Sequence, residues 1–479
     1  AAAAGQGEVA FVADPIADSE ITDTVNVDVL VCGQGPAGMA AALACAEQGL
    51  KTVAVEKGAS PTWRSATMGA FHDRVHKKFG VEFDTKQWLD DAMVNCSYRG
   101  EQTIYQKWIN TCDEAVDWFL DELEVPVENY FLTFNAGDFP EFTAAYDELS
   151  LSRSWNTSMN IPLSTDEISA KLQEKITAAG AEVLFNTPVV QLITEGEKVV
   201  GAIVKGENGY VKYLTAKGVV LATGGFGANL EMVASYKPEL KGFMTTNAAG
   251  AQGQGIAMAQ AVGAATVDMD QIQIHPTVQF DTAALITEGL RGDGAILVNA
   301  EGKRFTDEVG TRDVVSAAEI AQPGSYSWLV VDQAMVDASS VIAGYITKGL
   351  TVSGEDYAAL AEAMGVDAET FTATMEAWNA CVESKTDEEF GRTSFANPLN
   401  TAPYYAIKVT AGIHHTMGGL KINTATEVLN EAGEAIPGLF AAGEVTGGVH
   451  GANRLGGNAV ADFIVFGRIA GASAAEYAQ

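Results

Sequence analysis

A chain of 479 residues is too long for a single hydrophobic core, so we expect two or three domains. Its composition is that of a globular protein, and no run of about 18 uncharged apolar residues predicts a membrane span. The formal net charge of −33 argues against nucleic acid as a partner and against binding to anionic membranes, because like charges repel.

Five cysteines are spread along the chain with no CxxC or CxxCH pattern: Cys32, Cys45, Cys96, Cys112 and Cys381. This spacing excludes an iron–sulfur cluster with clustered thiolate ligands and a c-type haem. It also predicts no disulfide framework, and we predict no metal site.

Residues 1–23 are expected to form a flexible N-terminal segment, since they open with four alanines and stay polar to Asp23. Such a start is consistent with the remnant of a cleaved export signal, which would place the protein outside the cytoplasm. A cytoplasmic location stays open, because the sequence does not contain the signal itself.

The next segment has the pattern of a βαβ unit. The apolar run Val25–Val31 predicts a strand, the alanine-rich stretch Met39–Gln48 a helix, and Thr52–Val55 a second strand. The glycine-rich loop Gly33–Gly38 lies between the first strand and the helix. This unit opens a parallel sheet of the Rossmann type.

A longer helical pattern follows over residues 85–125. Over Glu182–Val220 the pattern changes to a β-meander with turns at Glu195-Gly196 and Asn208-Gly209. The stretch Val219–Leu221 is then expected to re-enter the main sheet.

Residues 274–412 have mixed strand and helix character. After them, Ile436–Ala442 predicts another buried strand and Asn458–Tyr477 a closing helix. We therefore predict an α/β fold in which a Rossmann-type dinucleotide-binding domain, residues 24–273 and 413–479, is interrupted by an inserted α+β capping (clamp) domain, residues 274–412.

The loop after the first predicted strand has the spacing GxGxxG. Gly33 permits a tight turn, Gly35 lets the backbone approach a pyrophosphate, and Gly38 allows the helix to pack closely. Glu56 follows Gly38 by 18 residues, at the end of the second strand, where a carboxylate binds the hydroxyl pair of a ribose. Spacing alone does not separate FAD from NAD.

Two later segments favour FAD. Ala222–Phe226 ends a predicted strand, and Gly438–Glu444 lies near the C-terminus. Both resemble the later FAD-contacting motifs of flavoproteins with two dinucleotide domains. Together with the first glycine loop, they imply a long cofactor lying across one sheet, so we expect an FAD-binding domain.

Two further segments carry a more specific resemblance. His414–Gly419 reads HHTMGG, and Glu444–Ala459 reads EVTGGVHGANRLGGNA. With the region His275–Asp313, they resemble the soluble fumarate reductases, flavoproteins related to succinate dehydrogenase and L-aspartate oxidase. The resemblance implies FAD-dependent reduction of the carbon–carbon double bond of a small unsaturated dicarboxylate, with fumarate as the expected substrate.

The glycine motifs and the resemblance together predict the FAD contacts. The expected contact residues are Gly33, Gly35, Pro36, Ala37, Gly38, Glu56, Lys57, Val189, Ala222, Thr223, Gly224, Gly225, His415, Gly443, Glu444, Ala459 and Val460. The run Arg64–Thr67 resembles the pattern RSHT of the membrane complexes, in which the histidine binds FAD covalently. Because Ala66 occupies the place of that histidine, we expect non-covalent FAD.

The resemblance also implies how a dicarboxylate is held. His414 and Arg454 would bind one carboxylate, with a backbone contact from Gly457, and His275 and Thr287 would bind the other. Arginine suits this role because its planar fork binds a carboxylate in bidentate fashion.

Arg291 and Arg312 lie near Glu288 in an otherwise acidic chain, which suggests anion binding, a proton relay or a solvated set of salt bridges. The resemblance implies that hydride passes from flavin N5 to one alkene carbon and that Arg312 protonates the other. Glu288 and Arg291 would resupply that proton. Since arginine rarely loses its proton in proteins, this role comes from the resemblance alone.

Two features depart from the family pattern. Gln254 stands in Gly253-Gln254-Gly255, where an aspartate is commoner, and the segment 129–160 has no clear family counterpart. If the aromatic side chains of that segment, among them Tyr130, Phe131 and Trp155, line the pocket, a substrate larger than fumarate would fit.

Other interpretations stay open. The nearest is a reductase of another unsaturated acid, such as urocanate, a cinnamate or a branched enoate, although His275 and Thr287 favour a second carboxylate. A succinate- or aspartate-oxidising enzyme and a non-catalytic flavin electron carrier are further alternatives. No haem or second flavin motif is present, so we expect a separate electron-donor protein, either a cytochrome or a flavin-bearing protein.

Overall fold

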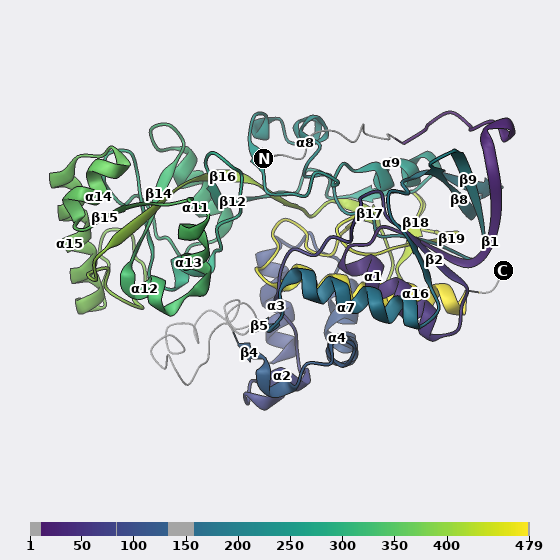
Figure 1. The fold of residues 1–479 in the computed structure, drawn as a ribbon, viewed down its shortest axis with the longest axis horizontal. Coiled ribbons are helices and arrows are strands. Elements are labelled where there is room, and N and C mark those ends of the chain that lie inside the picture. The colour runs from purple at the N-terminus through teal and green to yellow at the C-terminus, as the bar shows by residue number, and fades with distance from the viewer. Residues whose placement is uncertain (1–10, 83, 133–157, 478–479) are drawn as a thin grey trace.

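The computed structural model describes residues 11–82, 84–132 and 158–477 (Figure 1). Residues 133–157, with Phe134, Arg153 and Trp155, lie outside the described part, so a role of this segment in the pocket stays a prediction. Figure 1 shows a larger part and a smaller part, joined by the long strands β12 (Ile272–Gln279) and β16 (Tyr404–Thr416).

The larger part is built on an eight-stranded sheet. Its main path runs β18-β19-β9-β1-β2-β6, and β8 and β7 extend from β9 as an antiparallel ribbon. The predicted βαβ unit is present as β1 (Ile21–Cys32), α1 (Pro36–Glu47) and β2 (Thr52–Val55), with β1 and β2 parallel. The Rossmann-type α/β fold is therefore confirmed.

Three details of this sheet differ from the predictions. Residues Ile21–Asp23, assigned to a flexible segment, begin β1, because they pair with the first half of β9 (Gly209–Leu221). That strand continues from the ribbon into the main sheet without a break. Strand β6 (Glu182–Leu184) pairs in parallel with β2 and so belongs to the main sheet rather than to the meander. Apolar alternation does not reveal which strand is the neighbour.

Helix α16 (Asn458–Glu476) packs on α1 at close range. A Cβ added to Gly467 would lie 2.5 Å from the carbonyl oxygen of Ala37, and one added to Gly471 would lie 2.7 Å from that of Ala41. The small residues of both helices permit this approach. The C-terminal helix thereby presses the N-terminal helix of the glycine loop onto the sheet.

The predicted helical stretch 85–125 forms two helices, α3 (Thr85–Asn95) and α4 (Gln102–Leu123). They are separated by Ser97 and Tyr98, which have φ values of +54° and +56°, a backbone conformation that ends a right-handed helix.

The smaller part has its own sheet and its own core. Strands β10, β12, β13, β14, β15 and β16 form a six-stranded sheet, and a separate cluster of buried apolar side chains extends from Ile286 to Val409. Both predicted borders of the capping domain, 273/274 and 412/413, fall inside β12 and β16, which serve both parts. The domain boundaries thus stay a prediction.

The remaining strands are β3 (Thr67–Met68), β4 (Phe131–Leu132), β5 (Met159–Asn160), β7 (Val189–Glu195), β8 (Lys198–Gly206), β10 (Met244–Thr245), β11 (Thr266–Val267), β13 (Ile296–Val298), β14 (Ser327–Asp332), β15 (Val352–Gly354), β17 (Gly419–Lys421), β18 (Glu427–Leu429), β19 (Ala435–Ala441) and β20 (Thr446–Gly447). The remaining helices are η1 (Asp18–Glu20), α2 (Arg74–Lys78), η2 (Val127–Asn129), α7 (Thr165–Ala178), α8 (Leu230–Tyr236), η3 (Pro238–Leu240), α9 (Gln254–Ala261), α10 (Gly289–Gly292), α11 (Arg312–Ile320), α12 (Gln333–Ala338), α13 (Ser340–Thr347), α14 (Tyr357–Met364) and α15 (Ala368–Ser384). Within the described ranges, no helix combines the length and the apolar character needed to cross a membrane.

Candidate active site

The glycines of the first loop have different reasons to be glycine. Gly33 has a φ of +110°, and a Cβ there would lie 2.2 Å from the carbonyl oxygen of Ala222. A Cβ on Gly38 would lie 2.0 Å from the Gly33 carbonyl oxygen, whereas one on Gly35 would meet only the Thr62 carbonyl oxygen, at 3.9 Å. Gly33 and Gly38 are therefore needed for internal packing, and Gly35 leaves the N-terminus of α1 open to an anion.

Four predicted contact segments lie in a row at one edge of the large sheet. Strands β2, β1, β9 and β19 are adjacent and parallel. The loops that follow them carry Glu56-Lys57, Gly33–Gly38, Ala222–Gly225 and Gly443-Glu444. Carboxyl ends of parallel strands form the crevice in which α/β folds bind ligands. The arrangement fits a dinucleotide that crosses all four strands.

The Glu56 carboxylate is held in place by backbone groups. Its oxygens accept hydrogen bonds from the N–H groups of Gln34 and Gly58, both at 2.8 Å. Next to it, Lys57 Nζ donates to Gln254 Oε1 at 3.0 Å. Gln254, which replaces the commoner aspartate, thereby ties α9 to the end of β2.

At the other end of the row, Gly225 lies against the Glu444 carboxylate. A Cβ on Gly225 would lie 2.1 Å from Thr416 Oγ1 and 2.8 Å from Glu444 Oε1. Glu444 accepts hydrogen bonds from the N–H and the hydroxyl of Thr416, at 2.9 and 3.1 Å. Burial raises the pKa of Glu444 and holds the pKa of the neighbouring His415 well below its usual range. Thr223 Oγ1 is buried without a hydrogen-bond partner among the described residues, which fits a cofactor contact.

Three remaining predicted contacts flank this row. Val189 opens β7, two residues after Thr187, whose N–H donates to the Glu56 carbonyl oxygen at 2.8 Å. Ala459 and Val460 lie in the first turn of α16, where unpaired backbone N–H groups suit a polar ligand.

Arg312, Glu288 and Arg291 form one buried ion cluster. Arg312 Nη2 lies 2.7 Å from Glu288 Oε2, and Arg312 Nε donates to both Glu288 oxygens at 3.1 and 3.2 Å. Arg291 Nη2 donates to Glu288 Oε1 at 2.8 Å. The carboxylate thus bridges the two guanidinium groups, which is the connection that a proton relay requires.

The charges in this cluster keep Glu288 ionised. Burial by itself would raise the pKa of Glu288, but the cations Arg312 and Arg291 outweigh it and lower the pKa to about 2. Burial also lowers the pKa of Arg291. The shifts bring the proton affinities of the two groups closer together than they are in water.

Gln273, which the sequence analysis did not single out, joins this cluster to Arg454. Its Oε1 accepts from Arg312 Nη1 at 2.7 Å and from Arg454 Nη2 at 3.0 Å. Its Nε2 donates to the Arg454 carbonyl oxygen at 2.8 Å and to Asn453 Oδ1 at 3.0 Å. Residues two apart on a strand share a face, so the predicted role of His275 was a signal that could have found Gln273.

His275 and His414 come from the paired strands β12 and β16, and their ring centroids lie 5.0 Å apart. The N–H of Thr277 donates to His275 Nδ1 at 3.2 Å, which assigns the ring proton to Nε2. Thr246 Oγ1 lies 2.8 Å from His414 Nδ1. Burial and the charge of Arg312 hold the pKa of both histidines well below the usual range, so both rings are neutral hydrogen-bond partners at pH 7.

Arg454 is buried and only partly satisfied. Its Nη1 donates to the Leu455 carbonyl oxygen at 3.1 Å, while Nε has no hydrogen-bond partner among the described residues. Burial and the charge of Arg312 lower its pKa to about 9. A guanidinium in this state favours an anionic ligand.

Thr287 and Gly457 lie at the two sides of this cluster. Thr287 directly precedes Glu288, and its N–H donates to Tyr345 Oη at 3.0 Å. Gly457 caps α16 with a φ of +74°, and a Cβ there would lie 2.5 Å from Ser158 Oγ. The end of the unmatched segment 129–160 therefore approaches Gly457, whereas Tyr130 is buried in the main core.

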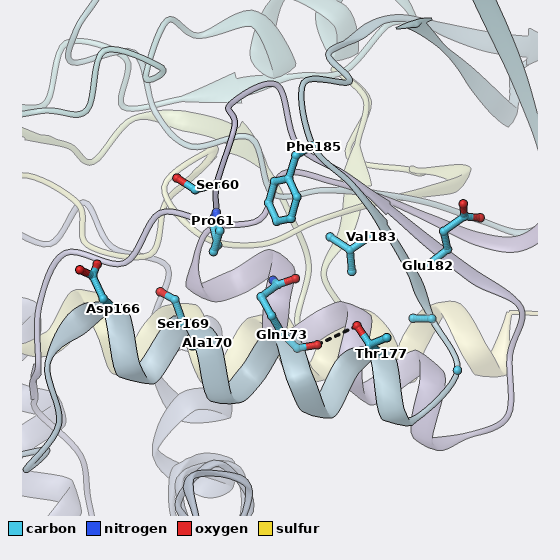
Figure 2. Close-up of a pocket in the computed structure, with 12 residues that line it drawn as sticks. Ser60, Pro61, Asp166, Ser169, Ala170, Gln173, Thr177, Glu182, Val183 and Phe185 are labelled. Atoms are coloured by element: carbon cyan, nitrogen blue, oxygen red, sulfur yellow. Dashed lines mark hydrogen bonds between the residues drawn. The ribbon is translucent and has the colours of Figure 1, made fainter. Parts of the chain in front are cut away.

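A separate cavity of about 860 Å³ lies between α7 and β6 (Figure 2). Figure 2 shows Gln173 of α7 facing Ser60 and Phe185 across it. None of the predicted site residues lines this cavity. It is connected to the cofactor edge only through Gln173, whose Nε2 donates to Gln34 Oε1 at 2.8 Å.

Comparisons with known proteins agree with this geometry. A protein family described as FAD binding domain matches residues 28–460. The NADH:fumarate oxidoreductase of Klebsiella pneumoniae (strain 342) is 39% identical over 459 residues, covering 95% of this chain and 48% of that enzyme. The urocanate reductase of Eggerthella lenta is 33% identical over 479 residues, covering 95% of this chain and 75% of that enzyme. A solved structure of the open conformation of a flavocytochrome c3 fumarate reductase has a TM-score of 0.78 and 34% identity, covering 96% of this chain and 79% of that one.

The chain spans about half the length of the Klebsiella enzyme and about three quarters of the flavocytochrome. The family match extends over both parts of the fold and over every predicted site residue. This chain is therefore an FAD-dependent oxidoreductase that belongs to the FAD-binding flavoprotein family of the fumarate reductases.

Proposed function

We propose that this chain reduces fumarate to succinate. The observation that carries the proposal is the charge of the buried cluster. Arg291, Arg312 and Arg454 bring three guanidinium groups against the single carboxylate of Glu288, which leaves a net charge of plus two. A dicarboxylate dianion balances that charge, whereas a monocarboxylate leaves one buried cation without a counter-charge, which is costly.

Each carboxylate has its own set of donors in this proposal. Arg454 and His414, with the backbone of Gly457, bind one carboxylate, and His275 and Thr287 bind the other. The neutral rings donate hydrogen bonds without adding charge, because burial lowers the pKa of both histidines. Binding both ends fixes the alkene between them, and this orientation lowers the barrier to reaction.

FAD, when bound, supplies the hydride through its N5 atom. Arg312 then gives a proton to the second alkene carbon, and it can do so only if it is reprotonated at once. Glu288 lies 2.7 Å from Arg312 and 2.8 Å from Arg291, so a proton can move from Arg291 through Glu288 to Arg312. The cluster therefore combines substrate binding with proton supply.

The cofactor and the electron donor complete the proposal. Ala66 offers a methyl group where a covalent flavin link requires a nucleophilic side chain, so FAD binds non-covalently. Electrons come from a separate redox protein, a cytochrome or a flavin-bearing protein, since the chain carries no haem motif.

The test is anaerobic reoxidation of the reduced holoenzyme by a panel of acids. We expect fumarate to exceed its monoamide and acrylate in kcat/KM by about ten- to a hundredfold, because each lost charge-assisted hydrogen bond costs roughly 1.5–3 kcal/mol. Arg454→Ala and His275→Ala should each lower fumarate turnover by a similar factor. Equal rates for fumarate and acrylate would sink the dicarboxylate assignment.

The second candidate is reduction of urocanate, which is favoured by the likeness to the urocanate reductase reported above. Urocanate carries one carboxylate and an imidazole ring, and the aromatic segment 129–160 could accommodate such a ring. A faster reaction with urocanate than with fumarate in the same panel would select this candidate.

A further inference from the structure

The buried face of α11 is mostly polar. Its buried side chains are Arg312, Val315, Ser316 and Glu319, and only one of the four is apolar. Arg312, Ser316 and Glu319 share one face of the helix, because they are four and then three residues apart. Acidic side chains are seldom fully buried without a partner or a role. This polar stripe leads from the proposed proton donor into the smaller part of the molecule.

Glu319 lies at the inner end of the stripe and is 0% exposed. Its Oε1 accepts a hydrogen bond from the Ser327 hydroxyl of β14 at 2.5 Å. Three polar atoms nearby have no hydrogen-bond partner among the described residues: Glu319 Oε2, Ser316 Oγ and Arg291 Nε. Buried polar groups of this kind are normally bridged by ordered water, which also conducts protons.

The protonation state of Glu319 follows from its surroundings. Burial raises its pKa to about 8, although the hydrogen bond from Ser327 and the charge of Arg291 both act to lower it. At neutral pH the carboxyl group therefore carries a proton. Glu319 in turn raises the pKa of Arg291, so each group lies within the field of the other.

The other titratable groups around α11 gather at the opposite end of the stripe. Strands β12 and β16 pack against α11, and they bring His275 and His414 into the field of Arg312. Glu288 of α10 binds Arg312 directly. Arg291 is thus the group that connects Glu319 to the relay.

We propose that Glu319 is the proton store behind the arginine relay. After Arg291 has passed a proton through Glu288 to Arg312, the O–H bond of the Glu319 carboxyl breaks and an N–H bond forms on the Arg291 guanidine. No electrons are transferred, and water then protonates the Glu319 carboxylate. The inference rests on the proposed function and extends its proton path away from the substrate.

Glu319→Gln tests this role, because glutamine keeps the volume and the acceptor for Ser327 but has no acidic proton. The assay uses FAD-loaded enzyme, a reduced viologen as donor and saturating fumarate. We expect kcat to fall about tenfold or more and the solvent deuterium isotope effect to rise, while KM and FAD content stay unchanged. Glu431→Gln, on an exposed turn, is the matched control and should behave like the wild type.

The pH profile separates proton supply from a structural role. Wild-type kcat should decline as pH rises through about 8, where Glu319 loses its stored proton, and Glu319→Gln should lack this decline. Ser327→Ala removes a hydrogen bond that lowers the pKa of Glu319, so the decline should move to higher pH.

The outcomes distinguish this inference from the proposed function. Wild-type kcat and pH dependence in Glu319→Gln would overturn the proton store, and so would an unmoved decline in Ser327→Ala if Glu319→Gln does not fold. Failure of the wild-type holoenzyme to reduce fumarate would instead overturn the proposed function.

Discussion

The cofactor edge and the arginine cluster of this protein are assembled in different ways. At the cofactor edge, each contact segment directly follows a strand, and the decisive groups are backbone atoms and glycines such as Gly33 and Gly38. In the arginine cluster, side chains distant in sequence meet: Gln273 binds groups of Arg454, 181 residues away, and Arg312, 39 residues away. The first site depends on local backbone shape, and the second on how the two parts of the molecule fit together. Cofactor retention and alkene reduction should therefore be separable by mutation.

Loss of the proposed proton donor is the strongest test of this separation. Arg312→Ala should lower alkene reduction by roughly a thousandfold, since no other described side chain takes its place between Glu288 and Gln273. Lysine there should restore only a fraction, because a single ammonium lacks the planar fork of arginine. FAD content and the extent of flavin reduction by dithionite should stay at wild-type values. Wild-type turnover of Arg312→Ala would remove this residue from the mechanism.

The converse test is made at the cofactor edge. Gly33→Ala should lose most of its bound FAD, because the new Cβ would lie 2.2 Å from the Ala222 carbonyl oxygen and the residue would keep a φ of +110°. We expect a cost of roughly 2–5 kcal/mol in the free energy of unfolding, from strain and from overpacking together.

Gly180→Ala is the matched control for that variant. Gly180 also has a positive φ, +97°, but a Cβ there would meet no atom within 4 Å. It should cost only the backbone strain, roughly 1–3 kcal/mol, and leave FAD bound. Equal flavin-to-protein absorbance ratios in the two variants would contradict the packing argument for Gly33.

Gln273→Leu sharpens the comparison at the joint between the two parts. Leucine has a similar volume but leaves Arg312 Nη1 and Arg454 Nη2 without their shared acceptor. We expect kcat/KM for fumarate to fall about ten- to a hundredfold, since an unpaired buried donor costs roughly 1–3 kcal/mol. FAD content should not change, and Gln106→Leu on the exposed face of α4 should have no effect.

The smallest expected effect concerns the flavin link. Acid or heat treatment should release intact FAD into the supernatant, because Ala66 cannot form a covalent bond to it. The measurement is flavin absorbance and fluorescence on each side of the precipitation. Flavin that stays with the precipitated chain would contradict the assignment of Ala66.

Much of the larger part could be predicted because its signals are local. A parallel strand buried on both faces reads as an apolar run, and the turn after it requires glycine, so Thr52–Val55 and the Gly33 loop were recognisable from the sequence. The continuity of β9 and the pairing of β6 with β2 were not, because strand partners are chosen by contacts between segments far apart in the chain.

At the candidate active site, the sequence by itself determined which residue types are present and that Arg291, Arg312 and Glu288 are close in the chain. Only the tertiary structure decided that Glu288 bridges both arginines, that Gln273 binds two guanidinium groups with one oxygen, and that Glu319 is buried beside Ser327. The physical reason is that pKa values and hydrogen bonds depend on burial and on the distances between side chains. Those quantities arise only when β12 and β16 bring the two parts of the chain together.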